Sequence, residues 1–205
     1  KTGVFGLYDL IGIDLMADVL KSFIKELSKK DPFQEVAKEI PLISNLIQTG
    51  YTGRKGKGGF YRMNKQNNQK ILEAINLETG EYSPTKKIDL GIETVNLKLL
   101  IERKDKYGEY AWSVISKIIK YASSLVPSIT DKFNDIDEAM RLGFNWAMGP
   151  FEMLKSIGVK NFFNRIDIFK NNNFLENLSK NKDENFYGER QKYTDIETLG
   201  KIKPK

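Results

Sequence analysis

The chain has 205 residues, 40% of them hydrophobic and 29% charged, and it carries a formal net charge of +6 at pH 7. These values are typical of one or two globular domains, and no apolar run approaches the roughly 20 residues that a membrane-spanning helix needs. Cysteine and histidine are both absent, which excludes disulfides, thiolate chemistry and the commonest general base and metal ligand.

The first fifty residues are predicted to be helical. Apolar residues recur every three or four positions between residues 14 and 27, which indicates an amphipathic helix. A second helical pattern covers residues 34–48, where Pro41 should kink or split the helix and Gly50 should follow its end.

A glycine-rich run, "TGRKGKGGFYR" at residues 52–62, follows these helices. We interpret it first as a tight turn that closes the fold, with Phe60 and Tyr61 in the core and the lysines facing water. The alternative is a phosphate site, in which loop amides, Arg54, Lys55 and Lys57 meet an anion such as a coenzyme A phosphate. A Walker P-loop is excluded, because no Lys-Ser or Lys-Thr pair follows the glycines and no clear strand precedes them.

Alternating apolar positions around "ETG" predict a short β-hairpin near residues 70–84, with Gly80 in the turn. Residues 85–93 read as a linker. A helix is predicted over residues 110–126, followed by "NDIDEAMRLG", where Asn134 or Asp135 should be the N-cap and Gly143 should lie just beyond the last turn.

Pro150 suits the first position of the next helix, and Glu152 in its first turn suits the positive end of the helix dipole. Residues 170–185 are expected to form loops and short helices, and the last fifteen residues an exposed tail. Three acidic residues resemble a carboxylate cluster, but at a helix start we interpret them as cap and dipole residues: Asp135, Asp137 and Glu138. Aromatic residues of the second half are expected in the core or in packing seams: Trp112, Trp146, Phe162, Phe163 and Phe169.

The chain contains an internal repeat. "GVFGLYDLIGI" at residues 3–13 aligns with "GPFEMLKSIGV" at residues 149–159, with two glycines, a phenylalanine and an isoleucine identical. Downstream, "GGFYR" at residues 58–62 is echoed by "ENFYG" at residues 184–188. Because both motifs occur in the same order, we infer two tandem copies of one helical unit. We expect the first copy to lack its own leading helices, as part of a longer protein.

These motifs resemble the C-terminal domain of 3-hydroxyacyl-CoA dehydrogenases, in which a helical "D-I-D-x-A-M-x-x-G" is followed by "M-G-P-F-E-L" and, later, by "G-x-K-x-G-x-G-F-Y". The first two patterns match Asp135, Ile136, Asp137, Ala139, Met140 and Gly143, and then Met148, Gly149, Pro150, Phe151 and Glu152. The third matches Gly53, Lys55, Gly56, Gly58, Phe60 and Tyr61. The arrangement is similar to multifunctional fatty-acid β-oxidation proteins, which carry two such helical domains after a dinucleotide-binding domain.

The resemblance implies a mainly α fold of two tandem helical domains, at residues 1–92 and 93–205, with the small β-hairpin inserted near residues 70–84. It implies that the parent protein oxidises 3-hydroxyacyl-CoA to 3-ketoacyl-CoA with NAD, in the cytoplasm. The catalytic histidine, glutamate and asparagine of the family would lie upstream, so we expect no catalytic, NAD-binding or metal-binding residue here and no activity of the fragment alone. The second copy has Trp112 at or near the position of the family's asparagine.

The resemblance also suggests which residues border the substrate. Gly3 and Phe5, at the start of a helix near the acyl end of the cleft, are substrate-binding candidates, and Lys55 and Lys57 are candidates for a phosphate of the acyl-CoA. Expected partners are an upstream Rossmann domain and an enoyl-CoA hydratase domain of the same polypeptide. We further hypothesise that the second copy packs against the first about a pseudo-twofold axis, as the partner subunit does in single-copy enzymes.

Two alternatives stay open at this point. One is a non-catalytic helical binding or scaffolding module. The other, which we consider weaker, is a basic nucleic-acid-binding protein, because the lysines are spread along the whole chain among nearly as many acidic residues.

Overall fold

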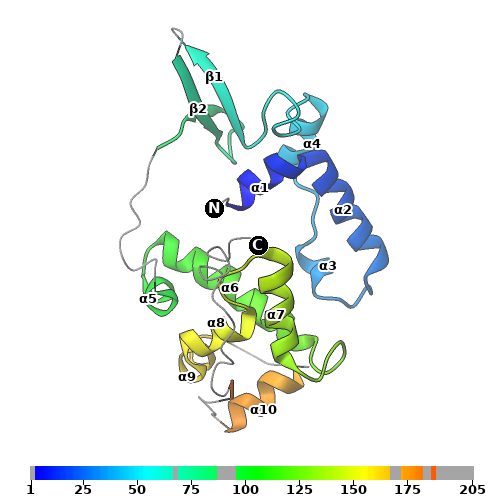
Figure 1. Cartoon of the computed structure of the whole chain (residues 1–205), viewed down its shortest axis with the longest axis vertical. Helices are drawn as coiled ribbons and strands as arrows, with labels where there is room; N and C mark the ends of the chain where they lie inside the picture. The colour runs from blue at the N-terminus through cyan, green and yellow to red at the C-terminus, as the bar shows by residue number, and fades with distance from the viewer. Residues whose placement is uncertain (1–2, 67–68, 87–95, 167–171, 182–185, 188–205) are drawn as a thin grey trace, which may run out of the picture. The chain divides into compact units, whose positions relative to one another are not determined.

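The structure is a computed structural model, and it describes residues 3–66, 69–86, 96–166, 172–181 and 186–187 (Figure 1). The chain divides into two compact units, unit 1 at residues 1–89 and unit 2 at residues 90–205. The expected boundary after residue 92 and most of the expected linker fall among residues 87–95, outside the described part, as does the tail from residue 188.

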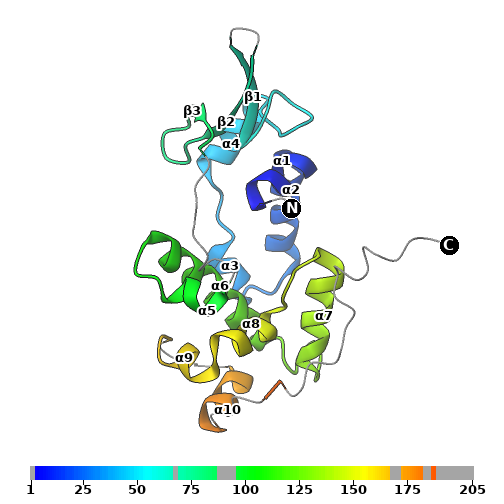
Figure 2. The same cartoon turned by 60° about the vertical axis from the view of Figure 1, so that its left-hand side comes forward.

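Unit 1 combines short helices with one small sheet. Its helices are α1 (Val4–Ile11), α2 (Ile13–Glu26), α3 (Phe33–Val36) and α4 (Pro41–Gln48). Its strands, β1 (Tyr61–Gln66), β2 (Gln69–Ile75) and β3 (Tyr82–Pro84), form an antiparallel sheet in the order β1-β2-β3 (Figures 1 and 2). The predicted hairpin is confirmed as β2 and β3, with Gly80 at a φ of 74° in the turn.

Local chemistry explains where these helices begin and end. Pro41 occupies the first turn of α4, where its missing N–H has no helical partner to lose, so the predicted split into two helices is confirmed. Gly12, at a φ of 115°, turns the chain between α1 and α2. The chain then closes over a core of Ile13, Leu46 and Phe60.

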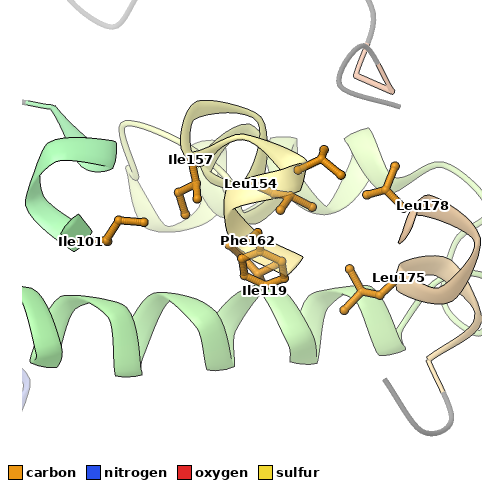
Figure 3. Close-up of a cluster of buried hydrophobic side chains, with 8 residues drawn as sticks. Ile101, Ile119, Leu154, Ile157, Phe162, Leu175 and Leu178 are labelled. Carbon is orange, nitrogen blue, oxygen red and sulfur yellow. The ribbon is translucent and has the colours of Figure 1, made fainter. Parts of the chain in front are cut away.

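The regular secondary-structure elements that the structure describes in unit 2 are all helices. Its elements are α5 (Leu97–Glu102), α6 (Lys106–Ser124), α7 (Phe133–Phe144), α8 (Pro150–Ile157), α9 (Val159–Phe163) and α10 (Asn173–Asn181). The core lies between α6 and the helices packed on it, where Ile119 contacts a cluster that includes Leu154, Ile157 and Phe162 (Figure 3). The mainly α fold that the sequence predicts is therefore confirmed.

The N-cap of α6 is Asp105, whose carboxylate accepts the backbone N–H groups of Tyr107 and Gly108 at 3.1 and 3.0 Å. The hydrogen bond from Arg103, together with these amides, lowers the pKa of Asp105 to about 2. The carboxylate is therefore ionised at neutral pH, where it also suits the positive end of the helix dipole.

The predicted ends of α7 are wrong. The helix begins at Phe133 after an N-cap at Lys132, so neither Asn134 nor Asp135 is the cap. Gly143 lies inside the last turn, and Asn145, at a φ of 54°, takes the left-handed conformation that ends the helix. Asparagine tolerates this conformation better than most non-glycine residues. The glycine in the sequence therefore did not mark the end of α7.

None of the helices in the described part of the chain is long and apolar enough to cross a membrane.

Candidate functional site

Asp9 on α1 organises the glycine-rich loop of unit 1. Its buried carboxylate accepts the backbone N–H groups of Phe60 and Tyr61, both at 2.8 Å, and its main-chain oxygen accepts the N–H of Arg54 at 2.7 Å. The loop is thereby tied at both ends to one residue of α1. Phe60 is buried and its ring packs 4.7 Å from that of Phe5, so the loop closes the unit 1 core. Tyr61, expected in the core, is instead partly exposed at the start of β1.

The loop glycines allow the backbone to approach Asp9. A Cβ at Gly59 would lie 2.0 Å from the Asp9 Oδ1, and a Cβ at Gly53 would lie 2.4 Å from the Asp9 main-chain oxygen. Gly53 also has a φ of 104°, which side-chain-bearing residues rarely adopt. The glycines thus have a packing role that is independent of any ligand.

Most loop amides point at protein acceptors. Gly53 donates to the Gly58 oxygen at 2.7 Å, Lys57 to the Gly50 oxygen at 3.1 Å and Gly59 to the Tyr61 oxygen at 2.9 Å. A phosphate-cradling loop needs several such amides directed at the anion. This geometry therefore favours the turn over an amide cradle for phosphate.

The two loop lysines also have protein partners. The Lys55 ammonium lies 2.8 Å from the Asp14 carboxylate, and its hydrogen bond holds the pKa of Asp14 below its ordinary value. The Lys57 ammonium donates to the main-chain oxygen of Thr49 at 3.1 Å. Both side chains brace the loop against neighbouring elements, whereas the turn interpretation had them facing only water.

A cavity of about 640 Å³ lies between the start of α1, the loop and β1. Its walls include Gly3, Gly6, Arg54 and Lys57, and neither Phe5 nor Lys55 is among its lining residues. Arg62 also reaches the wall, but its guanidinium is paired with Glu73 at 2.7 Å and stacks 4.0 Å from the Tyr82 ring. Of the four candidate substrate residues, the cavity therefore brings together Gly3 and Lys57.

The repeated motif has the same backbone geometry in both units. Gly3 precedes α1 with φ and ψ of −72° and 169°, and Gly149 precedes α8 with −77° and 172°. Both helices have eight residues, and each ends at a glycine, Gly12 or Gly158, whose φ is 115° or 90°. The repeat found in the sequence is thus a structural repeat at this corner.

In unit 2, Asp137 fixes the start of α8. Its buried carboxylate accepts the N–H groups of Phe151 at 2.8 Å and Glu152 at 2.9 Å, so Asp137 caps the following helix and not its own. Burial raises the pKa of Asp137. Desolvation and the hydrogen bond to Asp137 both raise the pKa of the Tyr187 hydroxyl. Glu152 accepts the Gly149 N–H at 3.0 Å and pairs with Arg141 at 3.0 Å.

Trp112 lies at or near the position where the resemblance places the family's asparagine. Its indole packs against Phe162 with ring centroids 5.6 Å apart, and the Arg165 guanidinium lies 4.2 Å from its ring centroid. These contacts make Trp112 a packing residue of the unit 2 core. In the part of the chain that the structure describes, no group of three acidic side chains is placed to hold a metal ion.

The two aspartates that anchor these corners were not recognised as such from the sequence. Asp9 stands inside an otherwise apolar helix, a pattern that signals a buried polar contact but not its partner. In the sequence, Asp137 is a helix-start carboxylate and part of the D-I-D motif, and neither feature gives its hydrogen-bond partners. Their partners are backbone amides 51 and 14 residues away, which sequence periodicity does not reveal.

Comparison with known proteins agrees with these observations. Residues 1–63 and 110–185 match the family described as 3-hydroxyacyl-CoA dehydrogenase, C-terminal domain. A Rickettsia prowazekii protein that carries the name of a fatty acid oxidation complex trifunctional enzyme is 41% identical over 166 residues, which are 81% of this chain and 23% of that protein. A Rickettsia felis protein with the same name is 40% identical over the same shares.

A Bacillus subtilis protein that carries the name of a 3-hydroxyacyl-CoA dehydrogenase is 30% identical over 167 residues, which are 78% of this chain and 21% of that protein. The chain thus spans less than a quarter of the length of these relatives. No solved structure matches the chain significantly. The two family segments cover more than half of the chain, and each contains one copy of the repeated glycine–helix–glycine motif. The chain therefore belongs to the family of 3-hydroxyacyl-CoA dehydrogenase C-terminal domains.

Proposed function

We propose that this chain is the helical, substrate-side portion of an NAD-dependent 3-hydroxyacyl-CoA dehydrogenase of fatty-acid β-oxidation, acting in the cytoplasm. The observation that carries the proposal is the match of both segments, residues 1–63 and 110–185, to the C-terminal domain of that family. The names of the longer relatives, which describe fatty acid oxidation and 3-hydroxyacyl-CoA dehydrogenase, support it.

The residues of this chain do not fit NAD. A dinucleotide site needs a parallel strand, a glycine loop and then a helix whose N-terminus faces the pyrophosphate. Here the glycine-rich loop leads into β1 of a small antiparallel sheet, and its amides are turned to protein acceptors. The chain also has no histidine to act as base. We therefore assign NAD and the proton transfer to a Rossmann domain outside these 205 residues.

The role of this chain is to form one side of the acyl-CoA site and to supply positive charge to it. Gly3 and Lys57 line the cavity of unit 1, where a cation suits a phosphate of coenzyme A. Phe5 supports this wall by packing on Phe60, and Lys55 holds the loop through Asp14. In the parent enzyme the chain's partners are the acyl-CoA, the Rossmann domain and an enoyl-CoA hydratase domain.

The redox assignment is tested by NADH oxidation with acetoacetyl-CoA. We expect no turnover from the 205-residue chain and turnover from the longer gene product that includes its upstream region. Turnover by the short chain would contradict the placement of the catalytic groups, and an inactive but folded longer protein would contradict the proposed reaction.

The substrate-side assignment is tested in the longer protein by Lys57→Ala, with Lys55→Ala as the matched control. Lys57 lines the cavity whereas Lys55 is paired with Asp14 beside it. We expect Lys57→Ala to raise the KM for acetoacetyl-CoA about fivefold, the effect of losing roughly 1 kcal/mol from an exposed charge contact, and Lys55→Ala to change it less than twofold. An unchanged KM for Lys57→Ala removes this residue from the site.

A further inference from the structure

The hairpin of β1 and β2 gives the unit 1 cavity a wall that continues beyond the family segments. The first of these segments ends at residue 63, and the second begins at residue 110. Met63, at the end of the first segment, and Leu72, outside both, line the cavity. In both views the two strands extend beyond the helices of unit 1 (Figures 1 and 2). This wall is therefore a feature of the chain that family membership does not account for.

The face of the hairpin that borders the cavity exposes a pair of apolar side chains. Met63 and Leu72 are directly opposite in the register of the two strands, so their side chains project from the same face of the sheet. They are 59% and 43% exposed. On the other face, Arg62 pairs with the buried Glu73 at 2.7 Å. Antiparallel sheets normally bury the apolar face and expose the polar one, so this reversal indicates that the apolar pair serves a ligand.

Two lysines, which we call the hairpin lysines, lie opposite each other on the same face. Lys65 and Lys70 are partners in the register, two positions from Met63 and Leu72 on the side away from the glycine-rich loop. Both are exposed, and neither forms an ion pair with any residue that the structure describes. Like charges directly opposite on neighbouring strands repel each other and destabilise the pairing. An anion bound between the hairpin lysines removes this repulsion, so the pair points independently to a negatively charged ligand.

The other end of the apolar pair meets two loop cations, Arg54 and Lys57, which line the same cavity. The backbone N–H of Arg54 is held by the Asp9 oxygen at 2.7 Å, but its guanidinium has no partner among the described residues. Such an arginine suits a phosphate, which it can bind through two parallel hydrogen bonds. Asp9 also lines the cavity, but both of its carboxylate oxygens accept backbone N–H groups. The apolar pair therefore lies between two groups of cations.

We propose that the nucleotide end of coenzyme A binds across this face of the hairpin. The adenine ring lies over Met63 and Leu72, the 5′-diphosphate meets the loop cations, and the 3′-phosphate lies between the hairpin lysines. This inference rests on the proposed function, which makes an acyl-CoA the substrate. The nucleotide end of coenzyme A has a planar, largely apolar base between two anionic groups, the same order as the groups on this face. The adenosine of NAD carries no 3′-phosphate, so the hairpin lysines favour coenzyme A over NAD.

The binding test uses the longer gene product and adenosine 3′,5′-bisphosphate, which carries the base and both phosphate positions without the thioester. We expect Lys65→Gln combined with Lys70→Gln to raise its Kd at least about fivefold in titration calorimetry. Lys21→Gln combined with Lys25→Gln is the matched control, because it removes the same charge from exposed positions of α2, and it should change the Kd less than twofold. Adenosine 5′-monophosphate, which lacks the 3′-phosphate, should bind equally to the wild-type protein and to the hairpin variant.

Two further measurements separate binding from a structural role of the hairpin. The urea midpoint of the hairpin variant should be unchanged or higher, because the substitutions remove two opposed positive charges. Adenosine 3′,5′-bisphosphate should slow the oxidation of Met63 by hydrogen peroxide, measured by mass spectrometry, because the ligand covers an exposed thioether. A lower midpoint that accounts for the loss of binding, or oxidation of Met63 at the same rate with and without the ligand, would overturn the proposal.

Turnover is measured separately, as NADH oxidation by the longer protein. The hairpin variant should have a KM for acetoacetyl-CoA about fivefold higher, with the same kcat and the same KM for acetoacetyl-pantetheine, which lacks the nucleotide. An equal change for both substrates, or an equal effect of the α2 control, would overturn the proposal. So would protection of Met63 from peroxide without ligand, which would identify another part of the longer polypeptide as the occupant. Nucleotide binding at the hairpin without turnover refutes only the proposed function, and turnover with nucleotide binding unchanged in the hairpin variant refutes only this inference.

Discussion

At the scale of single residues, the two copies use a buried aspartate in different ways. Asp9 extends from α1 to the amides that start β1, whereas Asp137 extends from α7 to the amides that start α8. The repeat places Lys155 at the position of Asp9, and its ammonium lies 5.5 Å from the ring centroid of Tyr187. A buried carboxylate is tolerable only when such donors satisfy it, so each aspartate fixes the geometry of its own unit.

Asp9→Ala is expected to destabilise unit 1 by about 2 to 3 kcal/mol. The substitution removes two charge-assisted hydrogen bonds and leaves the Phe60 and Tyr61 amides without their acceptor in a mostly buried place. Urea unfolding followed by hydrogen exchange of β1 amides measures the loss. Asp18→Ala, which removes an exposed carboxylate from α2, is the control, and an equal effect of the two substitutions would contradict the assigned role of Asp9.

At the scale of elements, the sequence predicted the helices and strands whose buried face is marked by regularly spaced apolar residues or by a turn signal. The helices α2, α4 and α6 have one apolar face each, and the hairpin of β2 and β3 has a glycine turn. Strand β1 was missed because its inward side is polar. Arg62 and Asn64 donate hydrogen bonds to the buried Glu73 of β2 at 2.7 and 3.0 Å. The inward positions of β1 are therefore polar in the sequence, whereas a strand is normally recognised by apolar residues at its inward positions.

Gly143→Ala is expected to stabilise unit 2 by roughly 0.5 to 1 kcal/mol. Gly143 is an exposed residue in the last turn of α7, and no heavy atom lies within 4 Å of a Cβ built on it, so alanine gains helix propensity without a clash. Urea unfolding by tryptophan emission measures the change, because Trp112 and Trp146, the two tryptophans of the chain, both belong to unit 2. A lower midpoint would show that Gly143 is needed for the end of α7 after all.

At the scale of the whole molecule, the order of motifs identified the family, but the site remained largely beyond sequence reasoning. The repeat and the "GPFE" and "GFY" motifs were sufficient to recognise the family. They lie where the chain enters a helix or the core of its unit, at Gly3, Gly149 and Phe60. The candidate substrate residues were harder to predict, because the lining of a cavity depends on where each basic side chain of the loop is directed. Lys55 turns to Asp14 while Lys57 reaches the cavity wall, and the loop sequence does not distinguish them.

The packing of the two copies against each other stays a prediction from the repeat, and it implies that the units unfold together. Gly59→Ala perturbs only unit 1 directly, because its Cβ would meet Asp9. If like surfaces of the two copies bury each other, as isologous packing requires, destabilising unit 1 removes that contact from unit 2 as well. We therefore expect Gly59→Ala to lower the tryptophan-detected urea midpoint of unit 2, although no tryptophan lies in unit 1. A midpoint unchanged by Gly59→Ala, with β1 amides exchanging faster, would mean that the units unfold independently and that the second copy does not replace a partner subunit.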